Sequence, residues 1–305
     1  RGIERLCEDA EKAVDEGCNY VILSDRGVDS DNAPIPALLA TSAVHHHLID
    51  KKKRVQTALV IETADAREVM HFALLVGYGA SAINPYLAFA VIDDLVKRKE
   101  IQLDFSTACH NFIKAVDKGL LKVMSKMGIS TLTSYKGAQL FEAIGLSDAL
   151  CRKYFGDTVS KVGGIGLEAM TRDILMAHAE AYGKDFDTQA PLPFIGQYSF
   201  RKDGEEHAWN PETIATLQLA TRMGSYKKFK EYTALVDNKP APIFIRDFLE
   251  FRPGTPIPVD EVEPEENIMR RFVTGAMSFG SISREAHEAL AIAMNAIGAR
   301  SNTGE

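Results

Sequence analysis

The stretch that decides the fold is Gly17–Gly27, which reads GCNYVILSDRG. It follows a segment with apolar residues at helical spacing, and Gly17 marks the point where such a helix would stop. The run Tyr20–Leu23 is short, apolar and bounded by a charged turn, which is typical of a buried parallel strand. A helix, a glycine, a buried strand and a polar turn therefore form the unit from which the first half is built.

The same unit recurs along the first half. The pattern predicts helices near 3–14, 37–48, 66–76 and 111–127, and strands near 20–23, 56–61, 82–84 and 129–132. For the long helix 111–127 we expect Asn111 as the N-cap and Gly128 as the stop. Strands that alternate with helices imply right-handed parallel crossovers, so the predicted class is α/β, as a layer or a barrel.

The regular alternation of helix and strand patterns is weaker after Leu150. An amphipathic helix is expected near 167–181, and another near 211–223 with Asn210 as its cap and Pro211 at its first position.

Six of the twelve prolines lie in the segment 237–264, together with an acidic run. Proline fixes φ and cannot donate to a β-ladder, so this segment is predicted to be an extended connector. Beyond it we expect a strand at Arg271–Thr274, a loop of small residues, and a helix that Ser283 caps and that runs through Met294.

Composition excludes several classes of protein. The 35 Lys and Arg residues against 42 Asp and Glu residues give a formal charge of −7. A mildly acidic surface gives no electrostatic reason to expect nucleic acid or an anionic membrane as a partner. No apolar run is long enough to span a bilayer, and no signal peptide is visible.

The four cysteines are scattered without a C-x-x-C pair, which fits neither a disulfide framework nor a metal site. We expect reduced, buried thiols in a cytoplasmic protein. The chain starts at Arg1 within a predicted helix and stops at Glu305 in a loop, so we expect a piece of a longer protein.

Ligands of parallel α/β proteins meet the carboxyl ends of the strands. That rule selects four clusters in the first half and two at the end: 25–27, 62–63, 84–86, 134–136, 275–281 and 301–305. For the first four, structural roles are favoured because no nucleophile, base and orienting group are evident together. The loop 275–281 is the better candidate, because small residues between a strand and a capped helix let backbone amides approach a flat ligand.

Two other motifs, at 45–47 and 163–166, do not indicate a metal site or a phosphate site. His45, His46 and His47 are consecutive, and consecutive helical residues point about 100° apart, so they cannot converge on one metal ion. The glycines of 163–166 precede a helix but lack the Lys and Ser/Thr of a P-loop. A tight turn that needs positive φ is the favoured interpretation of that segment.

Longer motifs carry a resemblance to one family. The segments 23–48 (LSDRGVDSDNAPIPALLATSAVHHHL), 62–88, 114–146 and 162–170 resemble the central domain of glutamate synthase large subunits. The segments 207–214 (HAWNPETI) and 270–305 (RRFVTGAMSFGSISREAHEALAIAMNAIGARSNTGE) resemble the start of the FMN-binding barrel of that family. The resemblance covers nearly the whole chain, and the motifs keep the family's order.

The resemblance implies a rudimentary TIM-barrel-like central domain of parallel strands at 1–190. It implies a connector and the truncated N-terminal part of the FMN-binding domain at 191–305, an incomplete second (β/α) barrel. The complete enzyme would be an oxidoreductase that converts L-glutamine and 2-oxoglutarate to two L-glutamate. Ammonia would pass through an internal tunnel, and electrons would reach FMN through an iron–sulfur cluster.

The implied partners are the amidotransferase and FMN-binding domains of the same polypeptide, with an NAD(P)H-oxidising subunit or ferredoxin as electron donor. The resemblance places one partial FMN site on two loops: Gly275, Ala276, Met277 and Ser278, and Asn302, Thr303 and Gly304. It places Glu305 near the ammonia exit and the substrate pocket. We expect this chain alone to bind no cofactor or metal, to be inactive, and to act as a structural bridge and ammonia-tunnel scaffold.

Two rival hypotheses come from other classes of protein. The first is a self-contained α/β protein that binds a metabolite or a phosphate. The second, less favoured, is a metal hydrolase built on the histidines at 45–47.

Overall fold

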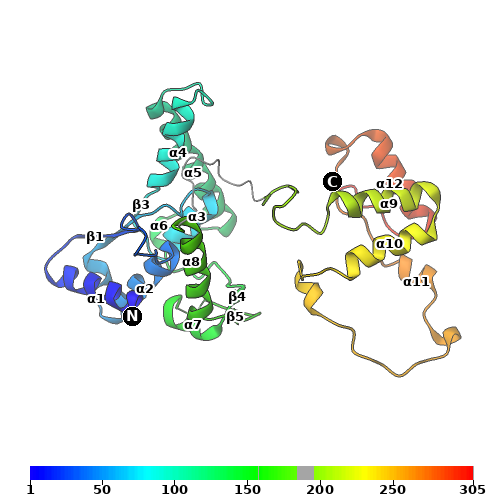
Figure 1. Cartoon of the computed structure of the whole chain (residues 1–305), viewed down its shortest axis with the longest axis horizontal. Helices are drawn as coiled ribbons and strands as arrows, with labels where there is room; N and C mark the ends of the chain where they lie inside the picture. The colour runs from blue at the N-terminus through cyan, green and yellow to red at the C-terminus, as the bar shows by residue number, and fades with distance from the viewer. Residues whose placement is uncertain (157, 184–195, 305) are drawn as a thin grey trace. The chain divides into compact units, whose positions relative to one another are not determined.

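A computed structural model describes residues 1–156, 158–183 and 196–304. The chain divides into two compact units, Arg1–Ala190 and Pro191–Glu305 (Figure 1). Unit 1 combines helices with short strands, and unit 2 is mainly helical over its described residues. None of the helices described in either unit is long and apolar enough to cross a membrane.

A three-stranded parallel sheet forms the centre of unit 1. Its strands β1 (Tyr20–Ser24), β2 (Ala58–Glu62) and β3 (Ala82–Asn84) pair in the order β1-β2-β3. The helices α1 (Gly2–Asp15) and α2 (Ala37–Asp50) pack on β1 and on each other. The expected α/β class with parallel strands is therefore confirmed, and across the described residues the sheet stays open rather than closing on itself.

The two faces of this sheet differ because side chains alternate along each strand. Val21 and Leu23 of β1 and Leu59 and Ile61 of β2 lie in the core. Burial of each such side chain stabilises the fold by roughly 1.5–3 kcal/mol. On the opposite face the β1 side chains are exposed, with an exposed fraction of 63% for Ile22, whereas those of β2 are partly covered.

Further elements complete unit 1. They are η1 (Arg54–Gln56), α3 (Val69–Gly77), α4 (Tyr86–Lys97), α5 (Phe105–Met127), α6 (Leu132–Tyr135), β4 (Gly145–Leu146), α7 (Asp148–Tyr154), β5 (Gly164–Ile165) and α8 (Leu167–Ala181). The helices α4 and α7 are not predicted by the sequence pattern.

The N-cap expected for the long helix is wrong. The helix α5 begins at Phe105, and the carboxylate of Asp104 accepts a hydrogen bond from the backbone N–H of Thr107. Asn111 therefore lies inside the helix, because an earlier carboxylate already satisfies the free amides of the first turn. The predicted stop at Gly128 is confirmed, with a left-handed φ of 72°.

The strand predicted at 129–132 is also wrong. The N–H of Ile129 donates to Met124 and completes the end of α5. The hydroxyl of Thr131 accepts from the N–H of Ser134, so the chain turns into the short helix α6. A local side-chain cap prevails here over a short apolar run.

The glycine-rich segment 163–166 contains the short strand β5, which pairs in parallel with β4. Gly163 and Gly164 have φ of 73° and 143°. A Cβ on Gly164 would lie 2.1 Å from the carbonyl oxygen of Gly145. The expected positive φ is confirmed, but Gly164 belongs to a short strand rather than to a tight turn.

In unit 2 the helices α9 (Pro211–Met223) and α10 (Tyr226–Asp237) pack together as a hairpin. The Asn210 side chain caps α9 as predicted, and α10 was missed by the sequence analysis. The remaining elements of this unit are η2 (Ile245–Phe248), η3 (Val259–Glu261), α11 (Glu265–Met269), η4 (Phe279–Ser281) and α12 (Arg284–Ala296).

The proline-rich connector is less extended than predicted. Lys239 Nζ lies 2.7 Å from a carboxylate oxygen of Asp247, and both side chains are largely buried. The same carboxylate accepts from the backbone N–H groups of Ile243 and Phe244. Lys239 first, and then these amides, hold the pKa of Asp247 well below its usual range. A charged anchor therefore folds 239–248 into a compact turn.

The strand predicted at Arg271–Thr274 is reduced to one parallel bridge between Val273 and Arg300. The following helix α12 is capped by Ser283, as predicted, and ends at Ala296.

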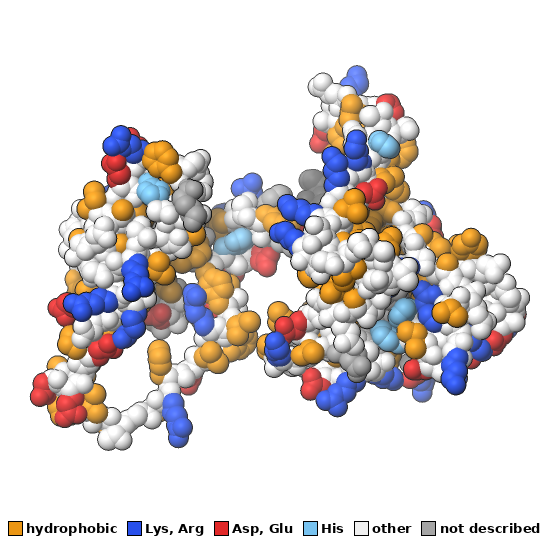
Figure 2. Space-filling model, turned by 180° about the vertical axis from the view of Figure 1, so that it is seen from behind, with side chains coloured by type: hydrophobic (Ala, Val, Ile, Leu, Met, Phe, Trp, Pro, Cys, Tyr) orange, Lys and Arg blue, Asp and Glu red, His pale blue; other side chains and the backbone are white. Residues whose placement is uncertain are grey.

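Large hydrophobic side chains reach the surface of both units, as the orange atoms of Figure 2 show. Examples with their exposed fractions are Tyr20 at 71% in unit 1 and Phe251 at 102% in unit 2.

Candidate functional site

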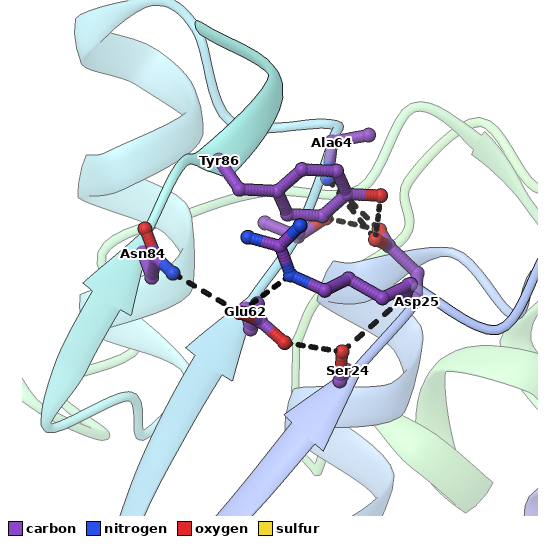
Figure 3. A network of polar contacts seen from close by, with 8 residues as sticks. Ser24, Asp25, Glu62, Ala64, Asn84 and Tyr86 are labelled. Carbon is purple, nitrogen blue, oxygen red and sulfur yellow. Dashed lines mark hydrogen bonds and ion pairs between the residues drawn. The ribbon is translucent and has the colours of Figure 1, made fainter. Parts of the chain in front are cut away.

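Polar side chains from all three strands of the sheet meet at its carboxyl edge in unit 1 (Figure 3). Glu62, the last residue of β2, is their centre. Its carboxylate accepts from the Ser24 hydroxyl at 2.6 Å and from the Asn84 amide at 3.1 Å, and it pairs with Arg26 Nε at 2.7 Å. The Ser24 hydrogen bond first, and the Arg26 contact next, lower the pKa of Glu62.

Asp25 forms the second centre of this network. One carboxylate oxygen accepts from the buried hydroxyl of Thr63 at 2.6 Å, and the other accepts from the hydroxyl of Tyr86 at 2.7 Å. The backbone N–H of Ala64 donates to the same carboxylate. Burial first, and the Asp25 hydrogen bond next, raise the pKa of Tyr86 to about 12.

Arg26 joins the two centres. Its guanidinium carbon lies 4.1 Å from the centroid of the Tyr86 ring, in cation–π contact, while its Nε contacts Glu62. Three of the clusters selected from the sequence, at 25–27, 62–63 and 84–86, are thus brought together.

A cavity of about 250 Å³ adjoins this network. Its polar wall contains Ser24, Asp25, Glu62 and Thr63, and its apolar wall contains Leu6, Val28 and Ile35 among others. The polar groups of the wall already bond one another: the Ser24 hydroxyl donates to Glu62 and the Thr63 hydroxyl donates to Asp25, and both carboxylates are also held by further donors. The network therefore supports the favoured structural interpretation: it fixes the loops that follow the three strands.

The fourth cluster, 134–136, lies elsewhere because no strand precedes it. Tyr135 is buried and donates to the carbonyl of Ala73, and Lys136 Nζ lies 3.4 Å from the Ser81 hydroxyl.

The three consecutive histidines contact three different partners. His45 Nδ1 accepts from Arg54 Nε at 2.8 Å, His46 Nδ1 lies 2.8 Å from the Ser42 carbonyl, and His47 Nε2 lies 2.8 Å from Glu11. Burial, with the nearby charge of Arg54, lowers the pKa of His45 to about 4. The described residues contain no group of three His, Cys, Asp or Glu side chains placed to hold a metal ion.

In unit 2 the two loops that the family resemblance relates to FMN, 275–278 and 302–304, lie next to each other. The N–H of Thr274 donates to the carbonyl of Arg300, and the Thr274 hydroxyl accepts from the N–H of Asn302 at 2.9 Å. Gly304 approaches the first loop closely: a Cβ on it would lie 3.3 Å from the amide nitrogen of Ser278 and 3.4 Å from that of Met277.

This arrangement has the features of one side of a ligand site. Over the described part of the chain, the backbone N–H groups of Gly275, Ala276, Met277 and Ser278 have no protein acceptor. Such amides can donate to the oxygens and ring nitrogens of a flat ligand. Thr303 is exposed beside them, and Glu305 lies outside the described residues.

Sequence reasoning missed Thr274 and Arg300, which hold the two loops together. The only signal available was that Thr274 closes a predicted strand and can accept a hydrogen bond through its side chain.

Comparison with known protein families assigns both units. Residues 1–147 match the family model for the glutamate synthase central domain, and residues 207–305 match the model for the conserved region in glutamate synthase. The chain belongs to the glutamate synthase family.

Named relatives extend the match over the whole chain. The "Glutamate synthase [NADPH] large chain" of Bacillus subtilis (strain 168) is 45% identical over 306 residues, which cover 100% of this chain and 20% of that protein. The "Glutamate synthase [NADH]" of Schizosaccharomyces pombe is 43% identical and covers 99% of this chain, 15% of its own length. The "Ferredoxin-dependent glutamate synthase" of Pyropia yezoensis is 42% identical, with 99% and 20% covered. The chain thus spans a fifth or less of these relatives.

Proposed function

We propose that this chain is part of a glutamate synthase whose complete polypeptide converts L-glutamine and 2-oxoglutarate into two L-glutamate, in the cytoplasm. In the balanced reaction water hydrolyses the amide of glutamine to the first glutamate and ammonia, and the ammonia condenses with the keto carbon of 2-oxoglutarate, with loss of water, to give an imine. Two electrons and two protons then reduce the imine to the second glutamate. The electron donor is NADPH, NADH or ferredoxin, the three kinds that the names of the relatives print.

Unit 1 serves as the bridge and as part of the ammonia-tunnel scaffold in this proposal. Its parallel sheet is an arc of a barrel-like domain, and the strand-end network around Glu62 and Asp25 holds the loops rigid. The exposure of Tyr20 and Ile22 on one face of β1 supports this role, because parallel sheets are normally covered on both faces. The rest of the polypeptide would supply that cover.

One observation carries the proposal for unit 2: the parallel bridge between Val273 and Arg300 brings the two flavin-side loops side by side. When bound, FMN supplies hydride transfer to the imine. The backbone N–H groups of Gly275, Ala276, Met277 and Ser278, with Asn302, Thr303 and Gly304 beside them, would hold one edge of it. Glu305 would lie at the ammonia exit.

The residues described in this chain do not fit an iron–sulfur cluster. Its cysteines are Cys7 and Cys151, both buried, Cys18, which is exposed, and Cys109, which is intermediate, and they do not converge. A cluster would need four thiolates at one place, so it belongs to another part of the complete polypeptide. The self-contained binding protein is not favoured, since the relatives match the chain from end to end.

Gly304→Val, made in the complete polypeptide, tests the flavin assignment. Gly304 has φ of 76°, and a side chain would push against the amides of Met277 and Ser278. The matched control is Gly254→Val, because Gly254 has open space around its Cα and no positive φ. We expect the first variant to lose bound FMN, measured by absorbance near the flavin bands, and the control to keep it. Full FMN occupancy in Gly304→Val would contradict the assignment.

A further inference from the structure

We infer that Thr274 is a positioning residue, whose hydroxyl fixes the second flavin-side loop in register with the first. The inference rests on the proposed function and goes beyond it, because Thr274 belongs to neither of the loops assigned to the flavin.

First, backbone hydrogen bonds pair the segment 272–274 with Arg300. Thr274 is the residue after the bridge residue Val273, and its own N–H donates to the carbonyl of Arg300 at 3.1 Å. The N–H of Arg300 donates in turn to the carbonyl of Phe272, also at 3.1 Å. These backbone bonds place the two chain segments side by side but end where both loops begin.

The second step is the side chain. The Thr274 hydroxyl accepts from the N–H of Asn302 at 2.9 Å, and this bond extends the pairing by one link into the second loop. The side-chain oxygen of Asn302 accepts from the N–H of Gly304 at 3.0 Å, which turns the chain tightly.

The third step is the close approach that results. Gly304 lies so near the first loop that a Cβ on it would be 3.3 Å from the amide nitrogen of Ser278, 3.4 Å from that of Met277 and 3.5 Å from the carbonyl carbon of Ala276. The acceptor oxygen of Thr274 is thus the first of a series of contacts that sets the distance between the loops 275–278 and 302–304. Sites of this kind lose affinity when their supporting bonds are removed, even if no group that touches the ligand changes.

The experiment uses the complete polypeptide, stripped of FMN and titrated with FMN by flavin fluorescence. Thr274→Val keeps the shape of the side chain and removes the acceptor, Thr274→Ser keeps the acceptor, and Thr255→Val is the matched control on an exposed threonine. We expect Thr274→Val to weaken FMN binding roughly fivefold, the loss that corresponds to one hydrogen bond. The visible circular dichroism of the bound flavin should change as well, while Thr274→Ser and Thr255→Val match the unsubstituted protein.

The outcomes separate this inference from the proposed function. If the unsubstituted protein binds no FMN, the proposed function fails and the inference fails with it. If it binds FMN and Thr274→Val shows the same affinity and dichroism, only the positioning role is overturned. A Thr274→Val protein that unfolds, judged by far-ultraviolet circular dichroism, would assign Thr274 to the fold alone and also overturn it.

Discussion

The hydroxyl of Tyr86 donates a hydrogen bond to Asp25 at 2.7 Å and so ties the start of α4 to the end of β1 across 61 residues. Because the acceptor is a carboxylate, Tyr86→Phe should lower the free energy of unfolding of unit 1 by about 1–2 kcal/mol at neutral pH. Chemical denaturation measures it, with Tyr20→Phe as the control on an exposed tyrosine. Equal stability of the two variants would show that the bond is not formed.

Tyr86 should also make the stability of the folded chain depend on pH in alkaline solution. Its pKa is raised to about 12 in the folded chain, from an ordinary value of 10. Between these values the unfolded chain loses a proton that the folded chain keeps, so this contribution to stability falls as pH rises from about 10 to about 12. The stability of Tyr86→Phe should therefore decline less steeply over that window. Parallel curves for the two proteins would contradict the prediction.

Glu11 should make the stability of the folded chain depend on pH in acid, where stability is lost as the pH falls. Lys53 first, and His47 next, lower the pKa of Glu11 to about 2 from an ordinary value of 4.5. A lowered carboxyl pKa stabilises the folded chain above the ordinary value, and this contribution is lost as pH falls from about 4.5 to about 2. Glu11→Gln should flatten the acid limb of the stability curve, whereas Glu8→Gln, on an exposed position of the same helix, should leave it unchanged.

Gly164→Ala should open the pairing between β4 and β5. Its methyl group would lie 2.1 Å from the Gly145 carbonyl oxygen, and its φ is 143°. Strain of this kind destabilises a fold by about 2 kcal/mol or more. Gly163→Ala is the control: with φ of 73° and open space around it, it should lose only about 1–2 kcal/mol. Thermal unfolding compares the two, and a smaller effect at position 164 would argue against the pairing.

Limited proteolysis tests the division of the chain. We expect early cuts in the exposed part of the connector, 249–258, where the anchor of Lys239 on Asp247 no longer holds the chain. The helix α5 should resist, because Ala108 and Met124 are buried on its packed face. Early cleavage within 111–127 would contradict the account of unit 1.

The sequence was most informative where one local signal decided the structure. Asn210, Gly128 and Ser283 end or begin helices as predicted, because caps act within one turn. The prediction of Asn111 as a cap was wrong because Asp104, an equally good cap residue, precedes it and α5 already begins at Phe105.

Other features depended on contacts between distant residues. The rule for strand ends correctly selected Asp25, Glu62 and Tyr86, but the bonds of Tyr86 to Asp25 and of Ser24 and Asn84 to Glu62 required the register of β1, β2 and β3. Thr274 escaped notice because its partner Asn302 lies 28 residues away. The rudimentary TIM-barrel-like arrangement implied by the resemblance needs strands beyond β1, β2 and β3 of the central sheet.

The central claim is that this chain belongs to a polypeptide that forms glutamate from glutamine and 2-oxoglutarate. The most direct test follows both products and substrates in the complete polypeptide supplied with reductant, and in the 305-residue chain alone. The account predicts two glutamates for each 2-oxoglutarate consumed by the complete polypeptide, and no glutamate from the chain alone. Absence of glutamate formation by the complete polypeptide, or its formation by the isolated chain, would contradict the account.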